Sequence, residues 1–301
     1  MDLTRAEIAR VHHLIAPHIR ETPVMETDGI VLKLECLQHA GSFKPRGAFA
    51  NLLTRKVPDM GLVAASGGNH GAAVAFAAKA LGQKARIYVP EISSPAKIAL
   101  IRRLGGEVVV GGADYAEALA ASETYQSRTG AMTVHAYDAA ETIAGQATVG
   151  RELDQQVSVD TILVAVGGGG LIGGIAAWYA GRVKIIAVEP EQSRCFDAAR
   201  QAGEPVDVSV AGIAADSLGA RRLGALSNAI SKDFVADNCL VSEDAIREAQ
   251  IWAWQALNLA VEPGGATALT ALRSGAYRPQ AGERVAVIMC GSNVDLATLA
   301  H

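Results

Sequence analysis

Short apolar segments alternate with longer segments of helical periodicity along almost the whole chain. The apolar segments predict strands at residues 31–35, 62–65, 86–89, 108–110, 161–166, 184–189 and 284–290. Several of them are apolar throughout, which is typical of parallel strands that are buried on both faces. This rhythm of strands and helices predicts an open α/β fold, in which ligands bind in the loops that follow the carboxyl ends of the strands.

Helices are predicted between these strands, and several of their ends can be read from the sequence. A helix over residues 72–81 ends before Gly82, another over 175–180 ends before Gly181, and a longer one begins near Ser242 and ends before Pro263. At the amino terminus Thr4 and Glu7 predict a capping box. That helix would place Ile8, Val11, Ile15 and Ile19 on one face, with Pro17 unfavourable in its last turn.

Composition excludes several classes of protein. Hydrophobic residues make up 50% of the 301 positions, which is too apolar for a disordered chain. The 27 Lys and Arg residues against 31 Asp and Glu residues give a net charge of −4. A mildly acidic chain without a basic block argues against nucleic acid or an anionic membrane as the main partner.

The cysteines and the amino terminus predict a cytoplasmic protein. The four cysteines contain no C-x-x-C pair, and a chain of this length does not need disulfides. The first residues lack the basic and then apolar layout of a signal peptide. Residues 162–181 are apolar enough to resemble a membrane span, but the glycine run at 167–170 favours a strand, a tight turn and a helix.

That glycine run, Gly167, Gly168, Gly169 and Gly170 followed by Leu171, is the strongest local signal for a ligand. Glycines allow a close backbone approach, and the free N–H groups at a helix start bind anions, usually phosphate. The spacing Gly168-x-Gly170-x-x-Gly173 also fits a dinucleotide fingerprint, with Glu189 placed to bind a ribose. An NAD-binding dehydrogenase is therefore an alternative, although half of the chain precedes the fingerprint.

Three further segments carry candidate chemistry. In Gly41-Ser-Phe-Lys-Pro-Arg-Gly47, Lys44 would lie at a helix amino terminus, where the dipole lowers a lysine pKa as Schiff-base chemistry requires; the alternative is a solvated lysine. In Ser66-Gly-Gly-Asn-His70, backbone N–H groups could hold a carboxylate, and His70 is more simply a packed residue than a base. Cys290 ends the last strand and alone says little.

Taken together, these motifs resemble the pyridoxal-phosphate enzymes of the tryptophan synthase β type (fold type II), and among them the serine/threonine dehydratases. The resemblance runs from Lys33 to the carboxyl terminus and includes Ile-Ala-Gly-Gln-Ala-Thr148, Glu262-Pro-Gly-Gly-Ala and Cys290-Gly-Ser-Asn. It implies two open, twisted parallel-sheet domains. Residues 1–53 and 138–301 would form the large cofactor-binding domain, and residues 54–137 a small inserted α/β domain.

The resemblance also implies a role for each motif. Lys44 would form the Schiff base with pyridoxal 5′-phosphate, Phe43 would pack on its ring and Asn69 would bind the ring hydroxyl. The segment from Gly167 to Leu171 would cradle the phosphate, and Cys290 would face the ring nitrogen. Ser66, Asn69 and His70 would bind the substrate carboxylate, largely through backbone N–H groups. The implied reaction is β-elimination from a hydroxyamino acid such as L-threonine or L-serine, giving a 2-oxo acid and ammonia in a cytoplasmic homodimer.

Several departures from the family pattern narrow this expectation. Related racemases carry a serine two residues before the asparagine, where this chain has Gly67, so a racemase ranks below a dehydratase. A β-replacement enzyme of the same fold is a further alternative. Relatives with a cation site use a glutamate that matches Glu189 and an aspartate where this chain has Cys195. A thiol is a poor ligand for a hard cation, so whether a cation binds near Glu189 is left undetermined. The short segment after Cys290 predicts no regulatory domain. The preferred hydroxyamino acid is left undetermined, with Tyr137 and Asp138 expected near its β-substituent.

Overall fold

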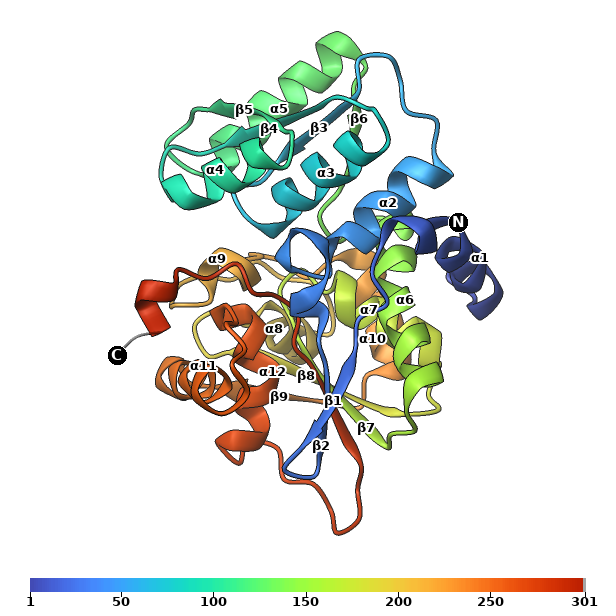
Figure 1. Cartoon of the computed structure of the whole chain (residues 1–301), viewed down its shortest axis with the longest axis vertical. Coiled ribbons are helices and arrows are strands. Elements are labelled where there is room, and N and C mark those ends of the chain that lie inside the picture. Colours follow the sequence, from blue (N-terminus) through green and yellow to red (C-terminus); the bar gives the residue numbers. More distant parts are fainter. Residues whose placement is uncertain (300–301) are drawn as a thin grey trace.

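The computed structural model describes residues 1–299 and contains two β-sheets (Figure 1). The larger sheet has six strands in the order β1-β2-β10-β7-β8-β9. They are β1 (Val24–Thr27), β2 (Ile30–Lys33), β7 (Thr161–Ala165), β8 (Lys184–Pro190), β9 (Asp237–Val241) and β10 (Val285–Ile288). Every pair is parallel except β1 with β2, which a tight turn at Asp28 and Gly29 joins antiparallel.

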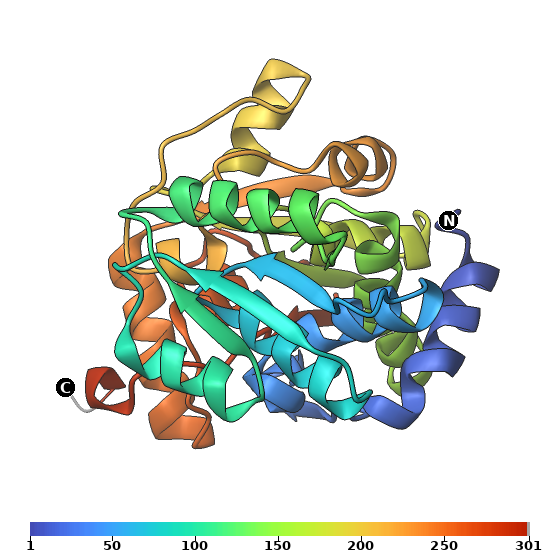
Figure 2. The same cartoon turned by 90° about the horizontal axis from the view of Figure 1, so that it is seen from above.

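The smaller sheet has four parallel strands in the order β5-β4-β3-β6. They are β3 (Leu62–Ala65), β4 (Ala85–Val89), β5 (Glu107–Val110) and β6 (Met132–Thr133). Seen from above, α5 (Tyr115–Thr129) covers one face of this sheet, and α3 (Asn69–Ala80) and α4 (Pro95–Arg103) cover the other (Figure 2). All of these elements fall within the predicted inserted domain, whose boundaries themselves stay a prediction.

The remaining helices surround the larger sheet. They are α1 (Arg5–Ile15), α2 (Lys44–Thr54), α6 (Ala140–Gln156), α7 (Gly170–Tyr179), α8 (Cys195–Ala202), α9 (Ala215–Leu218), α10 (Ala225–Phe234), α11 (Glu243–Leu257) and α12 (Pro263–Arg273). Short 3₁₀ helices lie at Ala16–His18, Glu35–Leu37, His39–Gly41 and Leu296–Leu299. In the strand order, the connection from β7 to β8 runs toward the β9 edge of the sheet, and the connection from β9 to β10 runs in the opposite direction. Right-handed crossovers therefore put α7 and α12 on opposite faces.

Each sheet has its own hydrophobic core. One cluster of buried side chains gathers around the six-stranded sheet and includes Ile162, Ile186 and Val287. A second gathers around the four-stranded sheet and includes Leu62, Ile87 and the alanines of α3. Because all strands but β1 run in parallel, the loops after β7 and β10 both lie at the carboxyl ends of the strands of the first sheet. The loops after β3, β4 and β6 lie likewise at the carboxyl ends of the strands of the second.

The structure confirms the predicted α/β fold with parallel sheets, and its differences from the predicted elements are local. All seven predicted strands are present, whereas β1, β6 and β9 were not predicted; β6 has two residues, and β9 carries polar residues at its start. The Thr4 hydroxyl caps α1 as expected, but the Glu7 carboxylate pairs with Arg10. No helix within residues 1–299 combines the length and apolar character needed to cross a bilayer.

Two predicted helices have different ends. The helix after the glycine run begins at Gly170, five positions before the predicted start, because Gly169 makes the turn with a φ of 91°. The helix capped by Ser242 ends at Leu257 because Asn258 adopts a left-handed conformation, with a φ of 55°, well before Pro263. Pro17 ends α1 early, as its position suggested, and the chain continues as a 3₁₀ turn.

Candidate active site

The lysine segment and the cysteine segment lie side by side, although almost the whole chain separates them in sequence. The Phe43 N–H group donates a hydrogen bond to the Cys290 carbonyl at 3.2 Å. Ser42 forms a β-bridge with Gly291. Lys44, the first residue of α2, is therefore held next to the carboxyl end of β10.

The Lys44 amine lies in a partly enclosed position between several loops. Its Nζ donates to the Ala136 carbonyl at 3.0 Å and lies 5.0 Å from the centroid of the Phe43 ring. Burial lowers the pKa of Lys44 to about 8, although the nearby Cys290 and Glu262 favour the charged form. A sizeable fraction of this amine is thus neutral, and nucleophilic, close to physiological pH.

A buried ion network fixes the helix that carries this lysine. The Arg46 guanidinium binds both oxygens of Glu35 at 2.8 Å and both oxygens of Glu152 at 2.7 Å. Lys33 Nζ lies 2.9 Å from Glu152, and all four side chains are at most 3% exposed. Arg46 is two residues after Lys44, so the network ties the first turn of α2 to β2 and α6.

The glycine run forms the turn between β7 and α7, as predicted. Side chains would not fit there: a Cβ on Gly168 would overlap the Tyr137 ring, and one on Gly170 would lie 3.0 Å from the Tyr137 backbone. Gly169, at a φ of 91°, lies against Leu223 and Ser227. The turn therefore presents backbone N–H groups at the amino terminus of α7, which is an arrangement suited to an anion.

The loop after β3 presents the start of α3 to the same region. Ser66 donates its N–H to the Tyr88 carbonyl at 3.0 Å, so only its hydroxyl is available, and this accepts a hydrogen bond from the Gly68 N–H group. The Ser66 N–H group is therefore engaged within the small sheet in this structure, and the role of Ser66 in substrate binding stays a prediction. His70 Nε2 lies 2.8 Å from the Val134 carbonyl, and burial lowers the pKa of His70 to about 3, as expected for a packed neutral ring.

Two residues for which the sequence predicted no role complete the site. Asn69 Nδ2 donates to Glu262 Oε1 at 2.5 Å, and Asn293 Nδ2 donates to Asn69 Oδ1 at 2.7 Å. Glu262 is 3% exposed, and burial raises its pKa to about 7. Both residues stand in motifs that were noted, Glu262-Pro-Gly-Gly and Cys290-Gly-Ser-Asn293, and a buried acid before Pro-Gly-Gly was the available signal.

The Cys290 thiol is buried and uncharged. Its Sγ lies 3.3 Å from the Gly264 carbonyl, and burial raises the pKa of this thiol above its ordinary value. Cys290 follows β10 and the glycine run follows β7, which is the neighbouring strand. The structure thus brings Phe43, Lys44, Cys290 and the glycine turn together at the carboxyl ends of the strands of the larger sheet. Asn69, from the smaller sheet, is hydrogen-bonded to Glu262 at the same place.

Glu189 does not serve the role that a dinucleotide site would need. Its two oxygens accept the Phe196 and Asp197 N–H groups, both at 2.8 Å, and its side chain is fully buried at the start of α8. Cys195 Sγ lies 3.1 Å from the Gly167 carbonyl. Over residues 1–299, no group of three or more His, Cys, Asp or Glu side chains is placed to hold a metal ion.

Comparison with known proteins agrees with this geometry. Residues 15–291 match the family model described as pyridoxal-phosphate dependent enzyme. The chain is 36% identical to a phenylserine dehydratase from Ralstonia pickettii, covering 98% of this chain and 94% of that protein. It is 35% identical to a serine racemase from Oryza sativa subsp. indica, covering 95% and 89%.

A solved structure extends the similarity to the fold. The structure of maize serine racemase superposes with a TM-score of 0.93 at 34% identity, covering 98% of this chain and 95% of that one. These matches overturn the NAD-binding alternative. A glycine turn between a strand and a helix is common to dinucleotide sites and to other anion sites, so the fingerprint spacing alone could not separate them. A dehydratase and a racemase are similar to this chain to the same degree.

Proposed function

The chain belongs to the pyridoxal-phosphate-dependent enzymes of fold type II, and from this premise we propose that it is a hydroxyamino-acid dehydratase. The proposed reaction converts a substrate such as L-threonine or L-serine to a 2-oxo acid and ammonia. The partly buried Lys44 amine, with its lowered pKa, supports Schiff-base chemistry at the junction of the loops after β6 and β10. The observation that carries the choice of a dehydratase is Gly67, which has no side chain to act as a second base.

The residues present fit pyridoxal phosphate. The glycine turn offers backbone N–H groups at the start of α7 and has no room for side chains of its own, because a Cβ on Gly168 or Gly170 would meet Tyr137. An amine with a pKa of about 8 suits Schiff-base formation. The neutral thiol of Cys290 leaves a pyridine nitrogen without a charged partner, which favours a moderate electron sink. When bound, the cofactor supplies that electron sink for charge that develops at the substrate α-carbon.

The chain's own groups then divide the remaining work. Lys44 Nζ, once its amine is free, takes the proton from the substrate α-carbon. The N–H groups at the start of α3, at Asn69 and His70, hold the substrate carboxylate. The Asn69 side chain is fixed between Glu262 and Asn293, so its amide keeps one orientation throughout. The N–H groups of the glycine turn, at the start of α7, anchor the phosphate.

Position 67 supports a dehydratase over a racemase. A racemase that uses two bases must move a proton at each face of the α-carbon, and Lys44 can serve only one of them. The serine that related racemases place two residues before the asparagine is Gly67 here, which carries no proton. Elimination needs a base on one face only, because the departing hydroxyl removes the electron pair.

A racemase is retained as the second candidate for one specific reason. A Cβ on Gly67 would overlap the Ser93 hydroxyl, which comes from the loop after β4. A hydroxyl from another strand thus fills the space where the side chain of residue 67 would be. The predicted cytoplasmic location and homodimer stay predictions, as does the preferred hydroxyamino acid.

The two activities are separated by assaying the enzyme reconstituted with pyridoxal phosphate. We expect release of 2-oxo acid and ammonia from L-threonine, L-serine, threo-phenylserine or threo-3-hydroxyaspartate, and no D-enantiomer on chiral chromatography. Lys44→Ala should abolish the activity and the visible absorption band of the bound cofactor. Interconversion of enantiomers without ammonia, lost in Ser93→Ala, would establish the racemase instead.

A further inference from the structure

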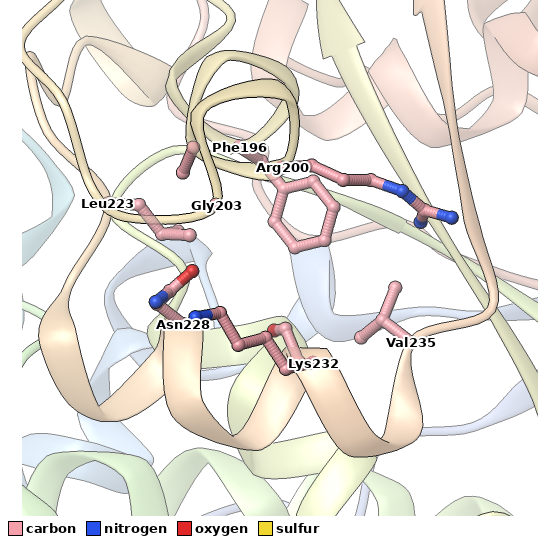
Figure 3. Close-up of a pocket in the computed structure, with 9 residues that line it drawn as sticks. Phe196, Arg200, Gly203, Leu223, Asn228, Lys232 and Val235 are labelled. Atoms are coloured by element: carbon pink, nitrogen blue, oxygen red, sulfur yellow. The ribbon is translucent and has the colours of Figure 1, made fainter.

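A cavity lies apart from the lysine, between helices α8 and α10. Its volume is about 220 Å³. Phe196, Ala199 and Arg200 line it from α8. Asn228, Ser231 and Lys232 line it from α10, and Val235 lines it from the position directly after α10 (Figure 3). Both sets follow helical spacing, so each helix turns one face to the other across the gap.

The cavity combines apolar walls with a cationic mouth. Phe196, Leu223 and Val235 are between 3% and 8% exposed and form the apolar part. Lys232 extends along α10 toward Asn228, which places an ammonium and an amide together at one end (Figure 3). Within residues 1–299 Lys232 forms no ion pair. Its charge is available to a ligand.

Two further polar side chains, Ser231 and Arg200, line the cavity, and only one of them lacks a partner. The Ser231 hydroxyl has no hydrogen-bond partner in the described part of the chain, although this residue is 6% exposed and lines the cavity. Arg200 is already engaged, because it donates to the Ala236 carbonyl at 3.0 Å and lies 3.5 Å from Asp237. A buried polar group without a partner is costly, so a ligand atom that pairs with Ser231 would remove this cost.

The walls of the cavity also touch the glycine turn. A Cβ on Gly169 would lie 2.6 Å from Leu223 and 2.8 Å from Ser227, which precedes Asn228 on α10. The Gly224 N–H group, at the start of α10, donates to the Gly168 carbonyl at 3.1 Å. Asp138 caps the same helix by accepting the Ala225 and Leu226 N–H groups. A shift of α10 would therefore move the turn.

We propose that the α8–α10 cavity is an effector site for a small monocarboxylate with an apolar tail, and that its occupancy changes the affinity of the glycine turn for the cofactor phosphate. The carboxylate would bind at Lys232 and Asn228 and accept a hydrogen bond from the Ser231 hydroxyl, and the tail would pack between Phe196 and Val235. A volume near 220 Å³ is below the range of drug-sized pockets and suits a molecule of this size. The coupling, but not the binding, rests on the proposed role of the glycine turn.

Binding is tested by calorimetric titration of the holoenzyme with 3-methylbutanoate. We expect saturable binding that weakens roughly tenfold in Lys232→Met, because one charge-assisted hydrogen bond is lost. Lys56→Met, which removes an exposed charge elsewhere, should bind as the parent does. The neutral 3-methylbutanamide should bind weakly. Equal binding of the amide, equal binding by Lys232→Met, or no saturable heat would overturn the site.

Coupling has a separate readout that does not require activity. The affinity of the apoenzyme for pyridoxal phosphate is measured by fluorescence with and without saturating 3-methylbutanoate. A shift of severalfold in the parent that is absent in Lys232→Met is the expected result. An unchanged affinity while calorimetry still detects the carboxylate would overturn the coupling. If the parent enzyme showed no dehydratase activity but still bound the carboxylate and still changed its cofactor affinity, the proposed function would be contradicted and this effector site would stand.

Discussion

At the scale of the residue, the chemistry depends on one amine whose surroundings are less favourable to charge than water. Lys44 Nζ has one hydrogen-bond acceptor, the Ala136 carbonyl, and one aromatic neighbour, Phe43. Neither replaces the hydration that an ammonium loses on burial, which is why the pKa of Lys44 falls to about 8. The acidic and thiol groups near it reduce this fall without reversing it.

This pKa predicts selective labelling of the apoenzyme. Because the neutral amine reacts and the ammonium does not, acylation of Lys44 should rise with pH and reach half of its maximal rate near pH 8. A lysine-containing model peptide in the same reaction should titrate near its ordinary value of about 10.4. Mass spectrometry of the Lys44 peptide gives the midpoint. A midpoint equal to that of the model peptide would show that burial does not lower this pKa.

At the scale of the element, the position of that amine depends on how α2 is attached to the rest of the sheet. Arg46 forms paired hydrogen bonds with Glu35, in the 3₁₀ helix after β2, and with Glu152 on α6. Gly145 on α6 lies directly against the Arg46 backbone. A side chain at position 145 would overlap that backbone. Close helix contact and paired charges together leave α2 little freedom at its first turn.

Removal of Arg46 is expected to destabilise the protein strongly. Arg46→Met leaves two buried carboxylates without their shared cation, for which a loss of about 3–5 kcal/mol in the free energy of unfolding is expected. Denaturation in urea, followed by circular dichroism, measures it. The control is Arg10→Met, which breaks an exposed pair with Glu7 and should change little. Equal free energies of unfolding for Arg46→Met and Arg10→Met would contradict the prediction that the buried network stabilises the protein.

At the scale of the whole molecule, the four-stranded sheet and its helices meet the rest of the chain across the proposed site. Lys97 on α4 forms an ion pair with Asp216 on α9, and a Cβ on Gly68 would lie 3.4 Å from the Asp216 carbonyl. The Lys97 side chain is 15% exposed. This contact joins the loop that would hold the substrate carboxylate to the part that would hold the cofactor.

The contact is therefore predicted to favour substrate binding, because it holds the two parts of the proposed site together. Lys97→Met and Asp216→Asn should each raise the KM for the amino acid, and the double variant should be less than additive. A coupling of about 0.5–1 kcal/mol corresponds to a roughly two- to fivefold difference in KM. Arg86→Met, which breaks an ion pair inside the four-stranded sheet, is the control and should leave KM unchanged. Additive effects of the two single changes would contradict the prediction.

Local patterns determined much of this protein. The strands, the glycine turn, the lysine at the start of α2 and the missing side chain at position 67 are each carried by a few consecutive residues. Backbone preference and hydrophobic periodicity act over such short distances, so these features can be read without a structure. The strands that were missed are short or partly polar, and they form because a neighbouring strand is already in place.

Only the tertiary structure decided which distant groups meet. Asn69 reaches Glu262 and Asn293 across 193 and 224 residues, and the cavity between α8 and α10 exists because two helices pack on other elements rather than on each other. The same holds for the Ser93 hydroxyl, which fills the space beside Gly67. Such contacts depend on how whole elements pack, and a local residue pattern contains no information about the partner that packing brings to it.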